Sequence, residues 1–204
     1  MSRSIFVYSG FIGPVIYAAV LFTLGALEPG YDPISQSMSE LGAVDAPYAI
    51  IMNTLGFPLL GIFFILFSVG VHRNISPGKG SGLGPFMIIL SGVFLILTGV
   101  FQCDSGCIDV TLTGELHSLF ATLAAFVMIP VPLTLVPRVY YDQNWRHYVW
   151  FSWVVVILTS LLSILYLVPE LAIWEGLLQR LAIGAPLVWI EVTAYKIIKE
   201  DKSG

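Results

Sequence analysis

Four residues of the chain combine reactive side chains with an unusual setting. Asp32, Asp104, His117 and Arg180 each lie close to the end of a long apolar run. A histidine, with an unperturbed pKa of roughly 6.5, can act as a base, a proton relay or a metal ligand, and carboxylates can orient it. We predict that the four residues meet in one pocket. His117, Asp104 and Asp32 are then the candidate catalytic set, and the guanidinium holds an anionic group of the substrate.

Each of these residues also has a structural interpretation. Asp32 can cap the backbone N–H groups of a helix. His117 can be a neutral histidine that hydrogen-bonds a neighbouring helix. Arg180 can direct its guanidinium outward and pair with Glu175 or Asp104. The sequence leaves these interpretations open beside the functional ones.

The stretch "YDPISQSMSELG", residues 31–42, is polar in an otherwise apolar chain. Asp32 is a favoured N-cap, Pro33 suits the first helical position, and Gly42 is typical of the residue just beyond a C-terminus. These signals predict a short amphipathic helix over about residues 33–41. The apolar face of this helix would consist of Ile34, Met38 and Leu41.

Ser35 and Ser39 fall on the flank of the predicted short helix. Together with Glu175 they are candidate ligand contacts beside Arg180. A serine nucleophile needs a base within hydrogen-bond reach, and residues 31–42 include no histidine. We therefore assign the serines to ligand binding rather than to catalysis.

Two cysteines flank Asp104 in "CDSGC". In an oxidising compartment Cys103 and Cys107 could form a disulfide, and otherwise they are free thiols. A metal held by both cysteines, Asp104 and His117 is a third alternative, but the spacing matches no strong zinc pattern. No metal is therefore assigned, and the residues identify no cofactor.

The positions of these residues depend on a strongly hydrophobic chain. Hydrophobic residues make up 57% of the 204 residues and charged residues 11%, against about a quarter in soluble domains. The sequence thus predicts a single, all-α integral membrane domain over residues 1–204, because a lipid-exposed backbone must satisfy its own hydrogen bonds. The six predicted spanning helices cover about residues 5–27, 49–71, 84–102, 114–136, 148–168 and 177–198.

The charged residues divide between the two sides of this bundle. The cations, except Arg180, fall on one side, which the positive-inside rule makes cytoplasmic. We therefore predict a multi-pass protein of the cell membrane with both termini in the cytoplasm. The first apolar run is longer than the roughly 7–15 residues of a signal-peptide core, so we expect it to be retained. The cytoplasmic cations are Arg3, Arg73, Lys79, Arg138, Arg146, Lys196, Lys199 and Lys202, and the opposite side carries Glu28, Asp32, Glu40, Asp45, Asp104, Asp109, Glu170 and Glu175.

Five segments in order carry a resemblance that spans nearly the whole chain. They are "DPISQSMSELGA", "PYAIIMNTLGF" with Asn53, "GVFQCDSGC", "TGELHSLFA" with His117, and "EGLLQRLAI" with Arg180. With them the chain resembles the DUF998 family of prokaryotic six-helix membrane proteins. The resemblance implies the six-helix arrangement and supplies no activity, since the family is one of unknown function. It draws attention to Asp32, Ser35, Ser39, Asp104, His117 and Arg180.

Three classes of function fit these observations. The first is an enzyme at the outer membrane boundary that acts on a lipid or small amphiphile with His117 as base. The second is a protein that binds a lipid or small molecule without turnover, or a small oligomeric transporter or channel. The third is a scaffold. The expected partners are membrane lipids and a small amphiphilic ligand, and no basic cluster points to nucleic acid.

Overall fold

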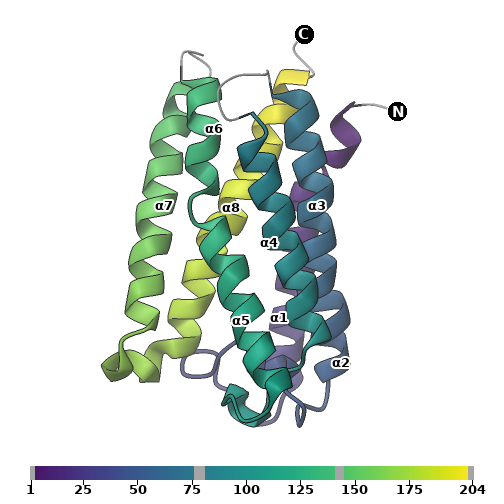
Figure 1. Ribbon diagram of the computed structural model, residues 1–204, viewed down its shortest axis with the longest axis vertical. Helices are drawn as coiled ribbons and strands as arrows, with labels where there is room; N and C mark the ends of the chain where they lie inside the picture. The colour runs from purple at the N-terminus through teal and green to yellow at the C-terminus, as the bar shows by residue number, and fades with distance from the viewer. Residues whose placement is uncertain (1–2, 76–80, 141–144, 202–204) are drawn as a thin grey trace.

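The computed structural model describes residues 3–75, 81–140 and 145–201. This part of the chain is all-helical and contains six helices that are long and apolar enough to cross a membrane, as the sequence predicts. Figure 1 shows them packed side by side as an elongated bundle. Lys79 and Lys202, which were used to predict the orientation, lie outside the described residues.

The six spans are built from eight α-helices, because the second and fourth spans are interrupted. The second span joins α2 and α3 through the π-helix Met52–Gly56, and α5 and α6 form the fourth. Short 3-10 helices cover Arg3–Phe6, Ser39–Gly42, Ser105–Cys107 and Pro169–Trp174. The α-helices are α1 (Ser9–Leu27), α2 (Ala49–Ile51), α3 (Phe57–Asn74), α4 (Leu83–Val100), α5 (Leu112–Met128), α6 (Val131–Val139), α7 (Arg146–Tyr166) and α8 (Glu175–Asp201).

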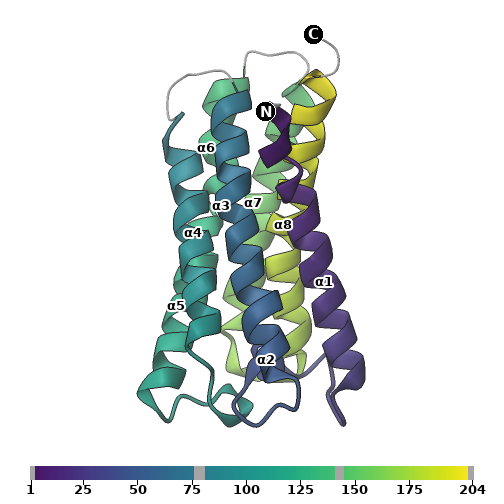
Figure 2. The same cartoon turned by 90° about the vertical axis from the view of Figure 1, so that its right-hand side faces the viewer.

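The two ends of the bundle differ in charge. Both ends of the chain lie at one end of the bundle (Figures 1 and 2), close to Arg73, Arg138 and Arg146 at the tips of their helices. We call this the basic end. The connections 28–48 and 101–111, and the one that leads from α7 to α8, lie at the opposite end, which we call the acidic end. All the candidate site residues lie at or near the acidic end.

Two glycines allow α3 and α4 to cross closely. A Cβ atom added to Gly92 would lie 2.6 Å from the backbone oxygen of Gly61, and one added to Gly61 would overlap the backbone oxygen of Gly92. Such small residues let the backbones of membrane helices approach each other. Of the helix pairs, α3 and α4 share the most extensive contact, so they form the closely packed side of the bundle.

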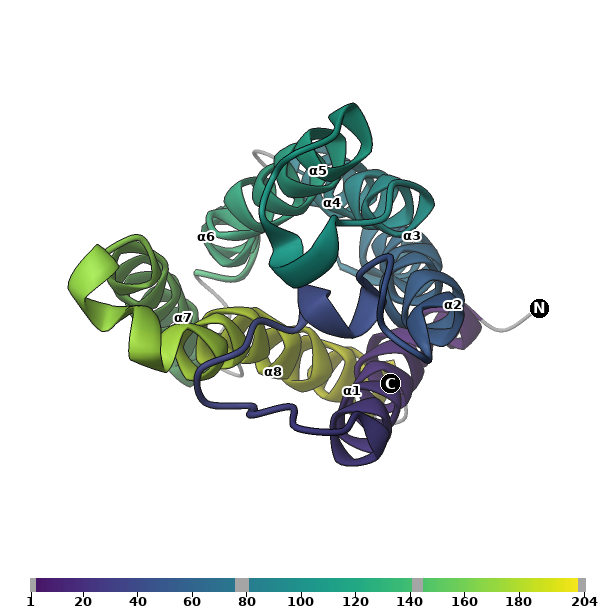
Figure 3. The same cartoon turned by 90° about the horizontal axis from the view of Figure 1, so that it is seen from below.

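The break between α5 and α6 opens the other side. Pro130 and Pro132 follow Met128, and proline provides no N–H group for the helical hydrogen-bond ladder, so the helix changes direction here. Beyond the break α6 packs against α7. On the acidic side of the break α5 packs against α4 and lies apart from α7 (Figure 3). A cavity lies between α5, α7 and α8.

The helix predicted over residues 33–41 does not form, and this expectation was wrong. Residues 33–36 make turns, and the 3-10 helix Ser39–Gly42 follows. Met38 and Leu41 are buried as predicted, but Ile34, the third member of the predicted apolar face, is exposed. The segment 31–42 runs across the acidic end between α1 and the centre of the bundle (Figure 3).

Competing hydrogen bonds explain why this segment is not an α-helix. In a helix the Ser37 N–H would bond the Pro33 oxygen, but it donates instead to the Glu40 carboxylate at 2.8 Å. The Met38 N–H, which would bond the Ile34 oxygen, donates to Gln179 Oε1 at 2.6 Å. Side chains and α8 thus take the backbone groups that a helix needs.

Candidate functional site

Arg180 fastens the segment 31–42 to α8. Its Nη1 donates to the backbone oxygens of Pro33 at 2.7 Å, Gln36 at 3.0 Å and Gly176 at 2.8 Å, and its Nη2 bonds the Tyr31 hydroxyl. The guanidinium also lies over the Tyr31 ring, with Cζ 5.5 Å from the ring centroid. These neutral oxygens occupy both terminal nitrogens, so the structure gives Arg180 a positioning role rather than a free anion site.

Asp32 makes the capping contacts of its structural interpretation. Its Oδ1 accepts from the Ile34 N–H at 3.0 Å, and its Oδ2 accepts from the Ser35 hydroxyl at 2.7 Å. These bonds hold the pKa of the exposed Asp32 carboxyl below its usual value. Both Asp32 and Ser35 are therefore engaged in the local turn.

Asp104 holds the turn that leads into α5, whose N-cap is Thr111. Its Oδ2 accepts from the backbone N–H groups of Val110 at 2.9 Å and Thr111 at 2.8 Å, and its Oδ1 accepts from the Thr111 hydroxyl at 2.8 Å. Gly114 leaves room for the carboxylate, because a Cβ there would overlap Asp104 Oδ2. The N–H donors hold the pKa of the Asp104 carboxyl below its usual value.

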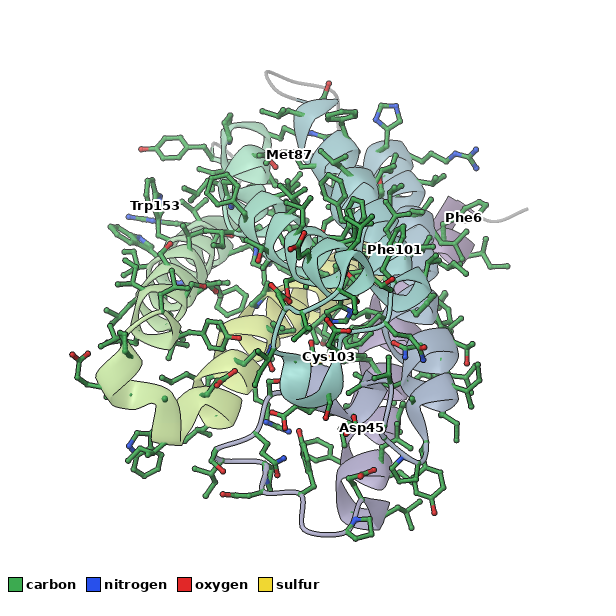
Figure 4. All side chains as sticks on the ribbon, turned by 60° about the horizontal axis from the view of Figure 1, so that its bottom comes forward. Phe6, Asp45, Met87, Phe101, Cys103 and Trp153 are labelled. Atoms are coloured by element: carbon green, nitrogen blue, oxygen red, sulfur yellow. A yellow bond between two sulfur atoms is a disulfide. The ribbon has the colours of Figure 1, made fainter. Side chains whose placement is uncertain are left out.

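A disulfide joins Cys103 and Cys107 at the tip between α4 and α5. Figure 4 places Cys103 at the centre of the acidic end, with Asp45 nearer its edge. Cys103 is fully buried, and the Val44 N–H donates to its backbone oxygen at 3.1 Å. Both sulfurs are used in the bridge, so the cysteines are not thiolate ligands for a metal.

His117 is the one member of the expected catalytic set that faces a cavity. Its side chain, on α5, is 2% exposed, and Phe57 packs edge-on to its ring at 5.9 Å between centroids. Nδ1 lies 2.9 Å from the Thr98 oxygen and 2.8 Å from the Phe101 oxygen. Carbonyl oxygens only accept hydrogen bonds, so Nδ1 carries the proton and Nε2 of the neutral ring carries the lone pair.

A cavity of about 430 Å³ lies between α5, α7 and α8 on the acidic side of the break. The wall toward the middle of the bundle is apolar, and polar side chains gather near the segment 31–42. Three lining residues on α5 are exposed on the outside of the bundle: Thr122, Ala125 and Phe126. The cavity thus has exposed lining residues on α5, toward the surface that a membrane would cover, and also at the acidic end, where Gly106 and Leu167 are exposed. The polar lining includes Ser37, Ser39, His117, Thr159, Tyr166, Glu175 and Gln179.

Three polar atoms in this lining are buried without a hydrogen-bond partner. They are His117 Nε2, Ser37 Oγ and Thr159 Oγ1. An unpaired buried polar group costs about 1–3 kcal/mol, and native proteins contain few of them. All three atoms belong to residues that line one cavity, which makes this cavity the candidate site for a ligand with a polar group.

The expected convergence of four residues in one pocket is not what the structure shows. His117 lines the cavity, whereas Asp32, Asp104 and Arg180 support the segments around it. All four lie at the acidic end, but Asp32, Asp104 and Arg180 bond backbone groups of the connecting segments instead of meeting at His117. Among the other candidates, Ser39 and Glu175 line the cavity and Ser35 does not.

Several lining residues were not singled out in the sequence. Ser37 lies in the segment 31–42 between Ser35 and Ser39, and Thr159 is one of four serine and threonine residues in the apolar helix α7. Gln179, beside Arg180, ties α8 to Met38. A polar side chain within a predicted span was the available signal for Thr159, because such residues face the bundle interior. Among the described residues, no group of three or more His, Cys, Asp or Glu side chains is arranged to hold a metal ion.

The comparison with known families agrees with this architecture. The family model described as "Protein of unknown function (DUF998)" matches residues 11–196, which include four whole spans, most of the first and last, and every residue of the cavity wall. No curated protein and no solved structure matches the chain. The family match covers most of the sequence, and the chain belongs to the DUF998 family.

Proposed function

We propose that this protein binds an amphiphilic molecule in the cavity between α5, α7 and α8, without the predicted catalytic set of His117, Asp104 and Asp32. The observation that carries the proposal is that three buried polar atoms without a partner, His117 Nε2, Ser37 Oγ and Thr159 Oγ1, belong to residues that line one mostly apolar cavity. Ligand sites commonly combine an apolar wall with a few polar groups that fix orientation. An amphiphile with its head group near His117 and its apolar chain along the apolar wall fits this combination of polar and apolar lining.

The exposed lining on α5 favours a ligand that comes from the membrane. The exposed lining residues Thr122, Ala125 and Phe126 lie within the fourth candidate span, where hydrocarbon would surround them. With the acidic end facing outward, as the cation distribution predicts, the ligand enters from the outer half of the bilayer. Its polar group then lies beneath the segment 31–42, near the membrane boundary.

Filling the cavity tests the proposal. Ala121 lies one helical turn beyond His117 on the cavity wall, and Ala121→Trp would occupy the space below the imidazole. The control is Ala19→Trp, at an exposed position on α1 away from the cavity. Both variants are extracted from membranes with native lipids, and native mass spectrometry identifies the molecules that stay bound after mild activation.

We expect wild type and Ala19→Trp to retain the same defined amphiphile, and Ala121→Trp to lose it. Equal retention by all three proteins would place the lipid elsewhere on the surface and reject the cavity as the site. A wild-type protein that holds no amphiphile, in extracts where both variants remain folded, would also reject the proposal.

A second candidate function is hydrolysis of an ester-linked amphiphile in the same cavity. It is favoured by the fixed tautomer of His117, whose Nδ1 faces two carbonyl oxygens and whose Nε2 is free to act as base. Nε2 would take a proton from water as the water oxygen bonds to the acyl carbon. The ester C–O bond then breaks, and the proton passes to the leaving alcohol.

His117→Gln distinguishes this candidate from binding alone. Glutamine keeps a polar side chain but provides no base that titrates near neutral pH. For an enzyme we expect turnover of a lipid ester by wild type and a loss of about 100-fold or more in the variant. Turnover that is equal in both proteins would exclude His117 as the base, and bound but unaltered ester would leave binding as the function.

A further inference from the structure

The polar end of the cavity offers hydrogen-bond acceptors and negative charge. His117 lines the cavity, and its buried Nε2 carries a lone pair, because the proton of the neutral ring is held at Nδ1. Glu175 contributes a carboxylate to the same lining, with the Tyr166 hydroxyl 3.4 Å from its Oε1. The hydroxyls of Ser37 and Thr159 can donate or accept. His117 Nε2 and the Glu175 carboxylate can only accept hydrogen bonds. They therefore match a ligand group that donates them.

No lysine or arginine is part of the cavity wall in the described residues. Arg180 is the cation nearest to it, and its field reaches the lining at Tyr17. However, backbone oxygens and the Tyr31 hydroxyl occupy both of its terminal nitrogens. Asp32 and Glu40 lie on the segment that Arg180 holds and offset its charge. The charge of Glu40 also acts on Glu175, which adds to the negative potential at this end.

The volume of the cavity limits the size of the ligand. About 430 Å³ lies toward the lower end of the roughly 300–1,000 Å³ typical of small-molecule sites. This space suits one hydrocarbon chain with a small head group better than a two-chain lipid. The apolar wall includes Leu60, Phe64, Leu95, Met128 and Ile183.

We propose that the ligand is a single-chain amphiphile whose head group donates hydrogen bonds and carries no negative charge, a hydroxyl or an ammonium, bound through His117 Nε2 and the Glu175 carboxylate. This specificity rests on the proposed binding function. It excludes fatty acids and lysophospholipids with a net negative head group. An anion would meet the Glu175 carboxylate and the imidazole lone pair with no free cation to compensate for them.

Three probes with the same oleyl chain test the head group alone. Monoolein has a neutral dihydroxyl head, oleylamine has a cationic head, and oleate has an anionic one. Each is titrated into delipidated full-length protein in a neutral detergent, and native mass spectrometry gives the bound fraction. We expect monoolein and oleylamine to bind, and oleate to bind about tenfold more weakly or worse.

Two matched variants test whether the Glu175 carboxylate causes the weaker binding of oleate. Glu175→Gln removes the carboxylate from the cavity, and Glu115→Gln removes one from the exposed side of α5, outside the lining. We expect Glu175→Gln to bring oleate to within about threefold of monoolein, and Glu115→Gln to leave the preference unchanged. Oleate binding as tightly as monoolein to wild type, or a preference that survives Glu175→Gln, would overturn the inference.

The result for Ala121→Trp separates this inference from the proposed function. If oleate binds best and Ala121→Trp abolishes that binding, the cavity is a ligand site with the opposite charge preference. If none of the probes binds, or all bind equally to wild type and Ala121→Trp, the proposed function itself fails together with the inference.

Discussion

At the acidic end, individual polar side chains form hydrogen bonds with the backbone of neighbouring segments. Asp104 accepts from two N–H groups of the turn just before α5, and Arg180 donates to three backbone oxygens. His117 belongs to this pattern through Nδ1, which bonds oxygens at the end of α4. The helix ends at this side of the bundle thus obtain partners for groups that a helix leaves unpaired.

The hydrogen bonds of Asp104 predict an acid-sensitive stability. The carboxyl pKa is lower in the folded protein than its usual value of about 3.9, so the stabilisation is complete above that value and is lost as the pH falls toward the folded pKa. We expect Asp104→Asn to lower the Tm at pH 7, and the gap from wild type to shrink as the pH falls from about 5 to 3. Thermal unfolding in detergent measures both.

Asp45→Asn is the control for this measurement. Asp45 is an exposed carboxylate of the same end that accepts from a side-chain group, the Ser105 hydroxyl, at 2.5 Å. A Tm gap between wild type and Asp104→Asn that stays constant down to pH 3 would contradict the role of the charged carboxylate.

Residue types and depth could be read from the sequence, but partners could not. His117 was identified as a buried ionisable residue because it falls inside an apolar run. Its partners are the backbone oxygens of Thr98 and Phe101, and Arg180 likewise bonds main-chain oxygens. Every residue has such an oxygen, so the sequence has no pattern that singles these partners out. The grouping of four side chains failed for this reason.

At the scale of elements, the segment 31–42 lies against the first turn of α8. The Leu177 N–H donates to the Ile34 oxygen at 2.9 Å, and Gln179 accepts from Met38. Gly176 makes this approach possible, because a Cβ at that position would overlap the Gln36 backbone oxygen and lie 2.7 Å from the Pro33 oxygen. The contact is between two backbones, so neither can move aside as a side chain would.

We predict that Gly176→Ala loosens the segment 31–42 from α8. The overlap with backbone atoms should cost about 1–3 kcal/mol, or roughly 2–12 °C in Tm for a chain of this size. Gly184→Ala, in the same helix, is the matched control, because a Cβ there meets nothing within 4 Å. We expect this control to be neutral or stabilising by about 0.5–1 kcal/mol.

Hydrogen exchange of the Met38 amide gives a local readout of the same prediction. It should speed up in Gly176→Ala and stay slow in Gly184→Ala. An equal Tm for the two variants, with unchanged exchange at Met38, would show that the segment tolerates the added methyl group.

Hydropathy was sufficient to predict the helices but not the interruptions. Long apolar runs made all six spans visible, because a spanning helix needs about 20 apolar residues. The break at Pro130 and the π-helix Met52–Gly56 lie inside runs whose hydropathy does not change. The turns at 33–36 depend on Arg180 and Gln179, which are about 140 positions away in the chain. Local capping signals predicted a helix because they do not include these distant competitors.

Across the whole molecule, and apart from Arg180, the cations of the described residues lie toward the basic end, opposite the acidic connections. Arg73, Arg138, Arg146 and Lys199 lie at helix ends on the basic side, and the disulfide lies on the acidic side. An oxidising compartment favours such a bridge. Both features favour an orientation with the acidic end outward.

We predict that the basic end faces the cytoplasm. A C-terminal fusion to green fluorescent protein should fluoresce, and a fusion of alkaline phosphatase at the same point should be inactive, because that enzyme needs an oxidising compartment. Thiol labelling of whole cells adds a readout at the other end: Cys103 and Cys107 should react only after reduction. An active phosphatase fusion would reverse the orientation and place the cavity in the inner half of the membrane.

The bond between Arg180 and the segment 31–42 also constrains the order in which the protein is assembled. The backbone oxygens of Gln36 and Pro33 lie 144 and 147 residues before the arginine that binds them. During synthesis the first hairpin is therefore made and inserted while its connection lacks every bond to α8, although Asn53 can already donate to the Gly42 oxygen. Only the arrival of the last helix supplies Arg180, Gln179 and the Leu177 N–H together. A chain that stops before α8 leaves this connection loose, so the closed segment is a mark of a completely synthesised protein.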